Sequence, residues 1–574
     1  MKKLIALLLA IVMVFGMVAC GGKDAPAADA PAADAPAADA PATDAPAADA
    51  PAADAPAADA PADEQEYLRL NWEYINSTKT GFQAPAMMGN YLDTNLLWNN
   101  LVRCDVETGE IVYELAKDLV VSPDGLTYTF TLADAYWHDG TPVTAADVVF
   151  TYNAQILGPW PTYASKLADV KGYQDLLDGK TDRIEGIYAV DDKTVVFEFN
   201  NPNYTLLSMS MNNIFAIGWF AILPAHILDT GVWEDMASSD YWTSPIGTGP
   251  YKVEEVSYPN YCVLTRNEEY FKAPAAIEKV LLTSYTDMEA QIAAAMAGDL
   301  YSMRAIAKTS AEDAAAQNSD LAFYLHDSAF YRGFGFMMGE GITKYPDLQK
   351  KEVRQALNLI IDKQALADYL GSASPATTYN NDLETNPDIP KWSRDVETGK
   401  AMLDAAGFDY NQTLKILAYY TDQATIDILD IVCANLAEVG ISAEYTIDAQ
   451  TPGDSWATGE YALYYFGGGY NTAVYQEWVP GGTKEAQLNG FETARRQEYA
   501  DLLAQYQNTA DAAGRKVISG QLQAMFVEDA WMTVSYFMNT GYLVNSGKLQ
   551  GWTGVSQDYE SMVVYDFSQW TLVE

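Results

Sequence analysis

Side chains that usually perform catalysis or hold metals are few in this chain and lie far apart. Its three histidines, His138, His226 and His326, are too widely spaced to suggest a shared metal site. The sequence has no G-x-S-x-G, H-E-x-x-H, C-x-x-C or G-x-x-x-x-G-K-S/T motif. Carboxylate pairs that hydrolyse glycosides stay open, because any two acids of so acidic a chain could meet in space. We therefore predict no catalytic residue, no cofactor, no metal and no enzyme, and we expect His138, which lies in a turn, to bond backbone groups.

Cys20 has a different context from the other cysteines. It follows two lysines at the start of the chain, an uncharged apolar stretch at 4–18 and the small residue Ala19. This pattern is typical of an export signal, and the stretch is shorter than the roughly 20 residues of a membrane span. Residues 17–20 resemble a bacterial lipobox, in which the cysteine is acylated. We predict a lipoprotein signal peptide at 1–20 with Cys20 as the lipidation site; an ordinary cleaved signal is the alternative.

Residues 21–66 form a low-complexity segment. The motif Asp-Ala-Pro-Ala-Ala recurs along it, and proline in each repeat disfavours continuous helix. Such a chain is extended and repels itself through its aspartates. At ~3.1 Å per residue, some forty residues reach on the order of 120 Å. We predict a disordered tether that holds a folded domain away from a membrane.

Composition narrows the class of the remaining chain. The whole sequence has 49% hydrophobic residues, 38 tyrosines and 13 tryptophans, which is typical of a globular protein, and its formal charge of −44 argues against binding nucleic acid or an anionic membrane. About 500 residues are too many for one core, so two or three lobes are expected. Cys104, Cys262 and Cys433 show no disulfide or zinc spacing; we expect buried free thiols, with one long-range bridge as the alternative.

The hydrophobic pattern predicts mixed α/β lobes. Residues 126–132 alternate between apolar side chains and threonine, which indicates a half-buried strand. Thr144 with Asp147 three residues later marks the start of a helix from Ala145 to about Ile156. A strand at 414–420, a helix at 426–439 and a strand at 441–447 form a crossover unit of a parallel sheet. Further strands are predicted at 195–199 and 251–256, and further helices at 287–297, around 353–361 and at 400–406.

The order of several motifs resembles the family 5 extracellular solute-binding proteins, the oligopeptide-, dipeptide- and nickel-binding components of ABC importers. The resemblance extends over roughly residues 97–552 and rests on several motifs in the family's order. They are Ser122 to Phe130, Trp137 to Pro142, Ala145 to Phe150, Gly247 to Tyr251, Val353 to Leu357, Ile361 to Lys363 and Lys400 to Phe408.

The resemblance implies an α/β fold of the two-lobed periplasmic-binding-protein type (class II), with an extra α/β subdomain, mixed sheets and two hinge crossings. Lobe I would combine residues 67–109, 235–326 and 538–574. The extra subdomain would be residues 110–234, and lobe II residues 327–537. The hinge crossings would lie near Phe330 and Tyr536.

The resemblance also implies a cleft lined by aromatic side chains from the hinge and from a strand and loop of lobe II. Core packing is the alternative for each aromatic, although a tyrosine-rich run interrupted by three glycines at 467–469 favours a surface made for close approach. Residues 83–87 would form a cleft loop. By position, the expected ligand-binding residues are Tyr163, Tyr331, Tyr465, Phe466, Gly467, Gly469, Tyr470, Asn471 and Tyr536.

One departure from the family concerns Gly469. Peptide-binding relatives commonly carry Asp-Tyr-x-x-Pro where this chain has Gly-Tyr-Asn-Thr-Ala at 469–473. That aspartate pairs with the free α-amino group of the ligand in a charge-assisted contact. Glycine lacks the carboxylate, so Asp454 or Glu477 would have to compensate, or the ligand lacks an amine. Oligosaccharides and other solutes therefore stay open beside peptide.

These observations predict an extracellular substrate-binding lipoprotein of an ABC importer. It would capture a peptide between two hinged lobes and deliver it to the permease, because the bound ligand favours the closed state. We expect a monomer on the outer face of the cytoplasmic membrane, in an envelope of Gram-positive type, with only the lipid anchor in the membrane. A secreted hydrolase and a wall-associated adhesin are the alternatives from other classes.

Overall fold

The structure is a computed structural model that describes residues 66–573, except 74–77, 89–91, 106–107, 210–212, 306–307, 372, 379–384, 390–391, 450–457, 470–471 and 553–564. The predicted signal peptide, Cys20 and nearly all of the tether lie outside the described residues. Within them, none of the helices has the combined length and apolar character needed to cross a membrane.

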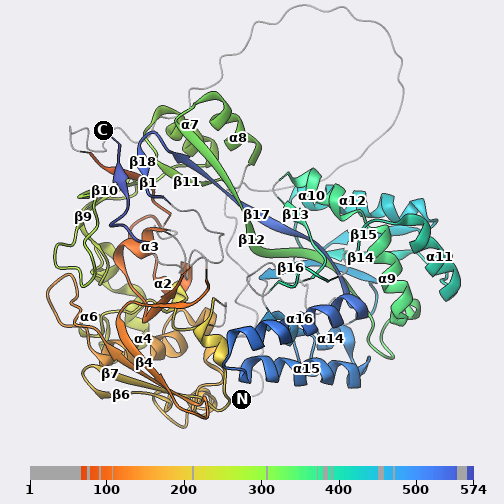
Figure 1. The fold of residues 1–574 in the computed structure, drawn as a ribbon, viewed down its shortest axis with the longest axis horizontal. Helices are drawn as coiled ribbons and strands as arrows, with labels where there is room; N and C mark the ends of the chain where they lie inside the picture. Colours follow the sequence, from red (N-terminus) through yellow and green to blue (C-terminus); the bar gives the residue numbers. More distant parts are fainter. Residues whose placement is uncertain are drawn as a thin grey trace, which may run out of the picture. The chain divides into compact units, whose positions relative to one another are not determined.

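A mixed sheet of eleven described strands runs through the folded part (Figure 1). Its order is β15-β14-β16-β12-β17-β11-β1-β10-β9-β8, and β13 pairs with β17 beside this path. The strands are β1 Leu68–Asn71, β8 Tyr251–Ser257, β9 Tyr261–Arg266, β10 Lys279–Thr283, β11 Ser302–Ala305, β12 Leu321–Phe336, β13 Ala373–Pro375, β14 Leu414–Ala418, β15 Ala443–Ile447, β16 Leu463–Gly469 and β17 Met532–Asn545.

Three smaller sheets and a set of helices complete the fold. The small sheets pair β4 Ala116–Val121, β5 Thr127–Leu132, β7 Thr194–Glu198 and β6 Ile187–Asp191 in that order, β2 Val102–Cys104 with β3 Ile111–Tyr113, and β18 Leu549–Gln550 with β19 Thr571–Leu572. The α-helices are α2 Pro85–Met88, α3 Leu92–Leu97, α4 Ala145–Leu157, α5 Tyr173–Leu177, α6 Ala225–Leu228, α7 Met288–Ala297, α8 Lys308–Gln317, α9 Lys351–Ile360, α10 Lys363–Leu370, α11 Val396–Ala406, α12 Gln423–Glu438, α14 Glu485–Leu488, α15 Thr493–Asn508 and α16 Ala512–Asp529.

Two long antiparallel strands, β12 and β17, belong to more than one hydrophobic core. Tyr331 of β12 and Val534 of β17 lie in a core built from residues 331–537. Further along β17, Tyr542 and Val544 lie in a second core with β1, β9 and β10. Figure 1 shows β12 and β17 side by side between these two groups of elements. β17 therefore runs from the first core to the second, and β12 runs into the first core from a neighbouring one that holds Leu321 together with Leu543 of β17.

The register of this strand pair changes where the chain passes between the cores. Asp327 pairs with Asn539, but the next pair is Tyr331 with Phe537, so β12 contains extra residues at this point. On its other edge, β17 pairs with β11 over 541–544 and with β13 over 536–538. A bulge of this kind bends a strand and interrupts its ladder.

A third core fills the four-stranded sheet and α4. In β5 the side chains alternate between half-buried threonine and fully buried aromatic or aliphatic residues, as the sequence predicts. The predicted capping box is also present at the start of α4: the backbone N–H of Thr144 donates to the Asp147 carboxylate at 2.8 Å. The core of this sheet includes Leu101 and Cys104, which precede residue 110.

The predicted crossover is confirmed, with helix starts earlier than expected. Strands β14 and β15 pair in parallel, and α12 connects them. α12 begins at Gln423 because the Asp422 carboxylate accepts the Thr425 backbone N–H at 2.9 Å. α11 begins four residues before the predicted start because Asp395 caps it in the same way. At 85–88 the chain forms the short helix α2, where we had expected a loop.

His138 joins two of the sequence motifs. Its Nδ1 accepts the backbone N–H of Gly247 at 3.0 Å, and its Nε2 lies 3.1 Å from the carbonyl oxygen of Gly249. The histidine therefore carries its proton on Nε2 and bonds backbone groups, as predicted. A Cβ at either glycine would collide with the backbone of Leu96 or Leu97, so glycine is required at both positions. Burial lowers the pKa of His138 to about 4.

The three cysteines of the folded part are free thiols. Cys104 and Cys262 are buried, and burial raises the pKa of the Cys104 thiol to about 12. Cys433 is only half-buried, against the prediction, because its position on α12 lies at the margin of the core.

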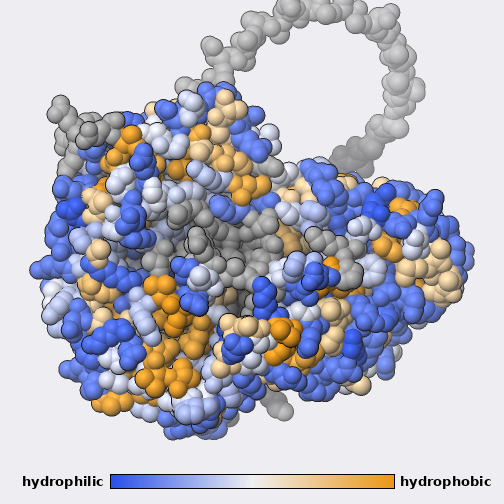
Figure 2. Space-filling view, viewed as in Figure 1, coloured by the Kyte–Doolittle hydropathy of each residue, from blue (hydrophilic) through white to orange (hydrophobic). Residues whose placement is uncertain are grey.

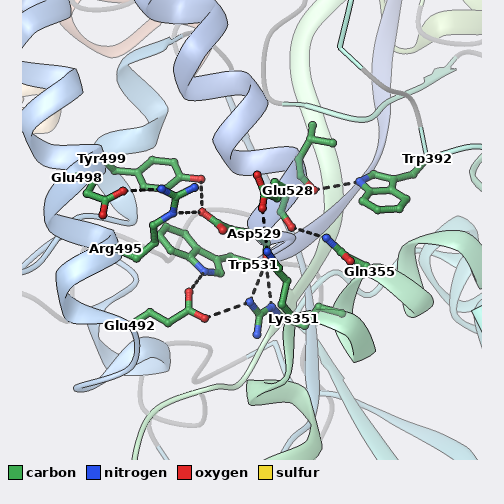
Figure 3. Close-up of polar contacts among 12 residues, drawn as sticks. Lys351, Gln355, Trp392, Glu492, Arg495, Glu498, Tyr499, Glu528, Asp529 and Trp531 are labelled. Carbon is green, nitrogen blue, oxygen red and sulfur yellow. Dashed lines mark hydrogen bonds and ion pairs between the residues drawn. The ribbon is translucent and has the colours of Figure 1, made fainter. Parts of the chain in front are cut away.

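The last carbonyl groups of α16, at residues 527–529, are capped by side chains from distant segments (Figure 3). Arg354 donates from Nε and Nη2 to the last of these carbonyls, that of Asp529, at 3.1 and 2.8 Å. Gln355 donates to the carbonyl oxygen of Glu528 at 2.7 Å, and the Trp392 indole donates to that of Val527 at 3.3 Å. A helix end leaves such carbonyls without partners inside the helix. The arginine and glutamine of the motif at 353–357 therefore fix the entry of α16 into β17.

The side chain of Asp529, the last residue of α16, is also bound by two residues of α15. Arg495 donates to the Asp529 carboxylate at 2.7 Å, and the Tyr499 hydroxyl donates to the same oxygen at 3.2 Å. The Trp531 indole donates to Glu492 at 2.9 Å, and Glu492 lies 3.5 Å from Arg354. Burial raises the pKa of Asp529 and lowers that of Arg354. Asp529 and Trp531, just before β17, are thus held by side chains at the start and in the first half of α15, and Arg354 of α9 holds the backbone of Asp529.

Arg354→Ala should lower the free energy of unfolding by about 3 to 5 kcal/mol, because buried carbonyls lose a charged donor that is fully buried itself. Arg354→Lys should recover only part of this loss, since a single ammonium lacks the fork of the guanidinium. Urea unfolding measures both. Lys351→Ala on the same helix is the control, with a change under about 0.5 kcal/mol. Equal effects of the Arg354 and Lys351 variants would contradict the capping role.

His138 should make stability depend on pH. Its folded pKa, about 4, lies below the ordinary value of 6.5, so its contribution is complete above the ordinary pKa and is lost as the pH falls toward 4. The stability difference between wild type and His138→Gln should therefore shrink by about 3 kcal/mol between about pH 7 and about pH 4. His226→Gln, at a partly exposed histidine, is the control. Parallel curves for wild type and His138→Gln would contradict this account.

Candidate ligand-binding site

Five residues lie on one face of the sheet at the crossing, and we call this the arginine face: Phe330, Arg332, Phe334, Tyr465 and Tyr536. Arg332 is paired in register with Gly467 of β16 and with Tyr536 of β17, and Phe334 is paired with Tyr465. Cross-strand partners share a face, and so do residues two apart on one strand. Phe330 pairs with Gly469, so this glycine also lies on the arginine face.

The guanidinium of Arg332 stacks against aromatic rings. Its Cζ lies 4.2 Å from the centre of the Tyr420 ring and 5.6 Å from that of Phe330. A Cβ at Gly467 would collide with Arg332 Nη1 and with the carbonyl oxygen of Tyr331. The glycine at 467 therefore gives room to the arginine. Arg332 and Tyr420 are half-buried, and Phe330 is 39% exposed.

Tyrosine hydroxyls surround the arginine. The Tyr465 and Tyr536 hydroxyls are hydrogen-bonded to each other, and the Tyr419 hydroxyl donates to that of Tyr420 at 2.5 Å. The ring centres of Tyr420 and Tyr465 are 5.8 Å apart. Burial raises the pKa of Tyr536 to about 12 and also raises the pKa values of Tyr420 and Tyr465. These hydroxyls stay protonated at neutral pH and can donate hydrogen bonds.

The opposite face of the sheet holds a different aromatic group. Phe466 lies with its ring centre 5.9 Å from that of Tyr331 and 5.1 Å from that of Tyr464. The Lys484 Nζ is 3.9 Å from the centre of the Phe466 ring and 3.5 Å from Glu477. All three rings are at most 2% exposed. Tyr331 and Phe466 pack in the core on the face away from Tyr465 and Tyr536, which are themselves only 2% exposed.

The remaining predicted residues are spread over several places. Tyr163 stacks on Trp219, with ring centres 3.6 Å apart and planes at 7°, in the region of the four-stranded sheet. Gly469 ends β16 and presents no side chain to the arginine face. Tyr470, Asn471 and Asp454 lie outside the described residues. Glu477 is already paired with Lys484 on the opposite face, where burial raises its pKa.

Sequence reasoning missed Arg332 and Tyr420. The signal for Arg332 was a single charged residue in a strand of aromatic residues and glycines, at 330–336. Tyr420 gave no signal, because it follows β14, and only the register of β12, β16 and β14 brings it to Arg332. Across the described ranges, no cluster of three histidine, cysteine or acidic residues is arranged to hold a metal ion.

Residues 110–480 match the model of the bacterial extracellular solute-binding proteins, family 5. The chain belongs to this family. A Brucella ovis protein provisionally named an ABC transporter peptide-binding protein is 29% identical over 415 residues, which is 70% of this chain and 69% of that protein. These matches confirm the family predicted from the motifs.

Solved structures of the family show the same two-lobed fold. HbpA2 from Haemophilus parasuis superposes with a TM-score of 0.71 at 20% identity, over 88% of this chain and 99% of that chain. The Bacillus subtilis oligopeptide-binding protein AppA, solved with a nonapeptide, superposes with a TM-score of 0.60 at 20% identity, over 89% and 100%. The predicted α/β fold with two lobes is therefore confirmed.

Gly467→Ala should destabilise the protein by about 1 to 3 kcal/mol, because the added methyl group meets Arg332 and a backbone oxygen in a packed sheet. Gly468→Ala is the matched control. Its Cβ would first meet the Tyr331 ring at 3.4 Å, so its stability should change by less than about 0.5 kcal/mol. Urea unfolding of both variants checks the pair. A tolerated alanine at 467 would mean that Arg332 does not lie over this glycine.

Proposed function

We propose that this chain is the solute receptor of an ABC importer, which captures a peptide between two lobes and passes it to the permease. The observation that carries the proposal is the family match over residues 110–480, joined to a strand pair that links two separate cores. The provisional name of the Brucella ovis relative and the nonapeptide complex of AppA support peptide as the solute. In this proposal the protein breaks no bond in its ligand and is not an enzyme.

The proposed boundaries of the lobes are based on the hydrophobic cores. We propose lobe II at 327–537, an extra subdomain at 110–234, and lobe I from 67–109, 235–326 and 538–574. The core of residues 331–537 supports lobe II, and the core with Tyr542 and Val544 supports the return of the chain to lobe I. The hinge would be the stretch of β12 and β17 around the register shift. Ligand contacts from both lobes would favour the closed state only through their differential affinity.

The anchor and location are part of the same proposal. The lipobox-like residues 17–20 and the repeat that follows support a protein acylated at Cys20 and tethered to the outer face of the cytoplasmic membrane. In this arrangement the folded part is monomeric, extracellular and joined to the membrane only through its lipid. Mass spectrometry of the protein from a bacterial host should find the mature chain starting at a diacylated Cys20. A mature chain that retains residues 1–19, or starts elsewhere, would contradict the anchor.

A second candidate is an oligosaccharide or another solute without an amine. It is favoured by Gly469, which leaves the arginine face without the carboxylate that binds the amine in peptide-binding relatives. Aromatic rings such as those of Phe330 and Tyr420 also suit the apolar faces of sugars.

A ligand screen separates the two candidates. The midpoint temperature of thermal unfolding should rise when peptide libraries are added to the purified chain, because a ligand that binds the folded state stabilises it by mass action. If an amine site exists elsewhere, N-acetylated peptides should give a smaller rise. Shifts with oligosaccharides alone would end the peptide proposal. Consumption of a bound solute in a turnover assay would contradict solute capture altogether.

A further inference from the structure

The arginine face contains a guanidinium with an unused hydrogen-bond donor. Arg332 Nη1 is buried and has no hydrogen-bond partner among the described residues, and none of their carboxylates lies within ion-pair distance of it. Leaving a buried charged donor unsatisfied is costly. The Arg332 Cζ lies 4.2 Å from the centre of the Tyr420 ring and 5.6 Å from that of Phe330, and neither ring offers the guanidinium a hydrogen-bond acceptor of the carboxylate kind.

The neighbouring tyrosines add further donors. The hydroxyls of Tyr465 and Tyr536 share one hydrogen bond, so one of their two hydrogens has no acceptor in the described part of the chain. Tyr420 accepts a hydrogen bond from Tyr419, and its own hydroxyl hydrogen likewise has no acceptor there. Three donors on three strands or strand ends therefore converge without a matching anion.

The Asp422 carboxylate, which lies near these tyrosines, already accepts hydrogen bonds from other groups. Asp422 acts electrostatically on Tyr465 and Tyr536, yet its two carboxylate oxygens accept hydrogen bonds from the Thr425 N–H at 2.9 Å and from the Thr425 hydroxyl at 3.0 Å. On the arginine face itself, Gly467 and Gly469 bring no side chain. No carboxylate of the described residues accepts a hydrogen bond from Arg332, Tyr420, Tyr465 or Tyr536, so these donors suit an acceptor that arrives from outside.

We propose that the arginine face binds a carboxylate of the captured solute. Arg332 pairs with the carboxylate, and Tyr420 and one hydroxyl of the Tyr465–Tyr536 pair donate hydrogen bonds to it. The half-buried Arg332 and Tyr420, next to the exposed Phe330, give the carboxylate its approach. This inference rests on the proposed function and adds the charge of the solute: the ligand presents a C-terminal or side-chain carboxylate, or a sugar acid, to lobe II.

The test compares matched acids and neutral ligands by thermal shift and calorimetric titration. One pair is a random tripeptide library with free C-terminal carboxylates against the same library as amides; the other is oligogalacturonate against neutral galacto-oligosaccharide. Wild type should bind the acid member of one pair at least tenfold more tightly, and the pair that responds identifies the source of the carboxylate. Preference for the neutral members, or no preference, would overturn the inference.

Variants of Arg332 and Tyr420 test whether the preference for the acid ligand arises at the arginine face. Arg332→Gln should weaken binding of the acid by about tenfold to a hundredfold, as expected for a lost charge-assisted hydrogen bond, and should abolish the preference over the neutral member. Tyr420→Phe keeps the ring beside Arg332 but loses the hydroxyl, and it should weaken binding of the acid by about fivefold. The control Arg394→Gln changes an arginine already paired with Glu438 and Asp362, and should bind like wild type.

The outcomes separate this inference from the proposed function. Saturable binding with equal affinity for acids and neutral ligands, unchanged in Arg332→Gln, would leave solute capture standing and remove the carboxylate site. No shift of wild type with any ligand would remove the proposed function and this inference with it. If Arg332→Gln fails to fold, Tyr420→Phe and Arg332→Lys decide by the same acid-to-neutral ratio, which the lysine should retain in part.

Discussion

The backbone pairing of β12 with β17 is the constraint on which the other features depend. These strands share a long antiparallel ladder; one end lies in the core of residues 331–537, and the other end lies in different cores through Leu321 of β12 and through Tyr542 and Val544 of β17. Each end of the pair packs in its own core, and the register shift lies between the two ends. The same pairing sets which side chains share a face, and it therefore brings Arg332, Tyr465 and Tyr536 together at the passage between the cores.

Several residues of the family motifs maintain the fold and contact no proposed ligand position. His138 ties two loops through backbone groups, and glycine is needed at 247 and 249 because the backbone of 96–97 lies against them. Arg354 ends α16 at the point where β17 begins. Both devices satisfy buried polar groups that would otherwise destabilise the structure. The first device joins two loops and the second fixes the end of α16 just before β17, so these residues maintain the structure without touching the proposed ligand position.

The sequence allowed the local elements to be predicted, because their signals lie within a few residues. The alternation in β5, the capping box of Thr144 and the crossover from β14 to β15 are examples. The starts of α11 and α12 were missed because the capping aspartates lie upstream of the apolar pattern. The division of the aromatic residues between two faces depends on register between distant strands, which no local pattern encodes. For this reason Tyr331 and Tyr465 were placed in one site, although they lie on opposite faces.

The distance between the proposed lobes, with and without solute, tests the central claim most directly. Pulsed electron paramagnetic resonance would measure this distance between spin labels on cysteines that replace the exposed residues Leu177 and Val517. The full chain would also carry Cys20→Ser and Cys433→Ser, so that only the introduced cysteines are labelled. The account predicts a broad distribution that becomes shorter and narrower when solute saturates the protein, because the solute stabilises the closed state. An identical distribution with and without bound solute would contradict capture by hinged lobes.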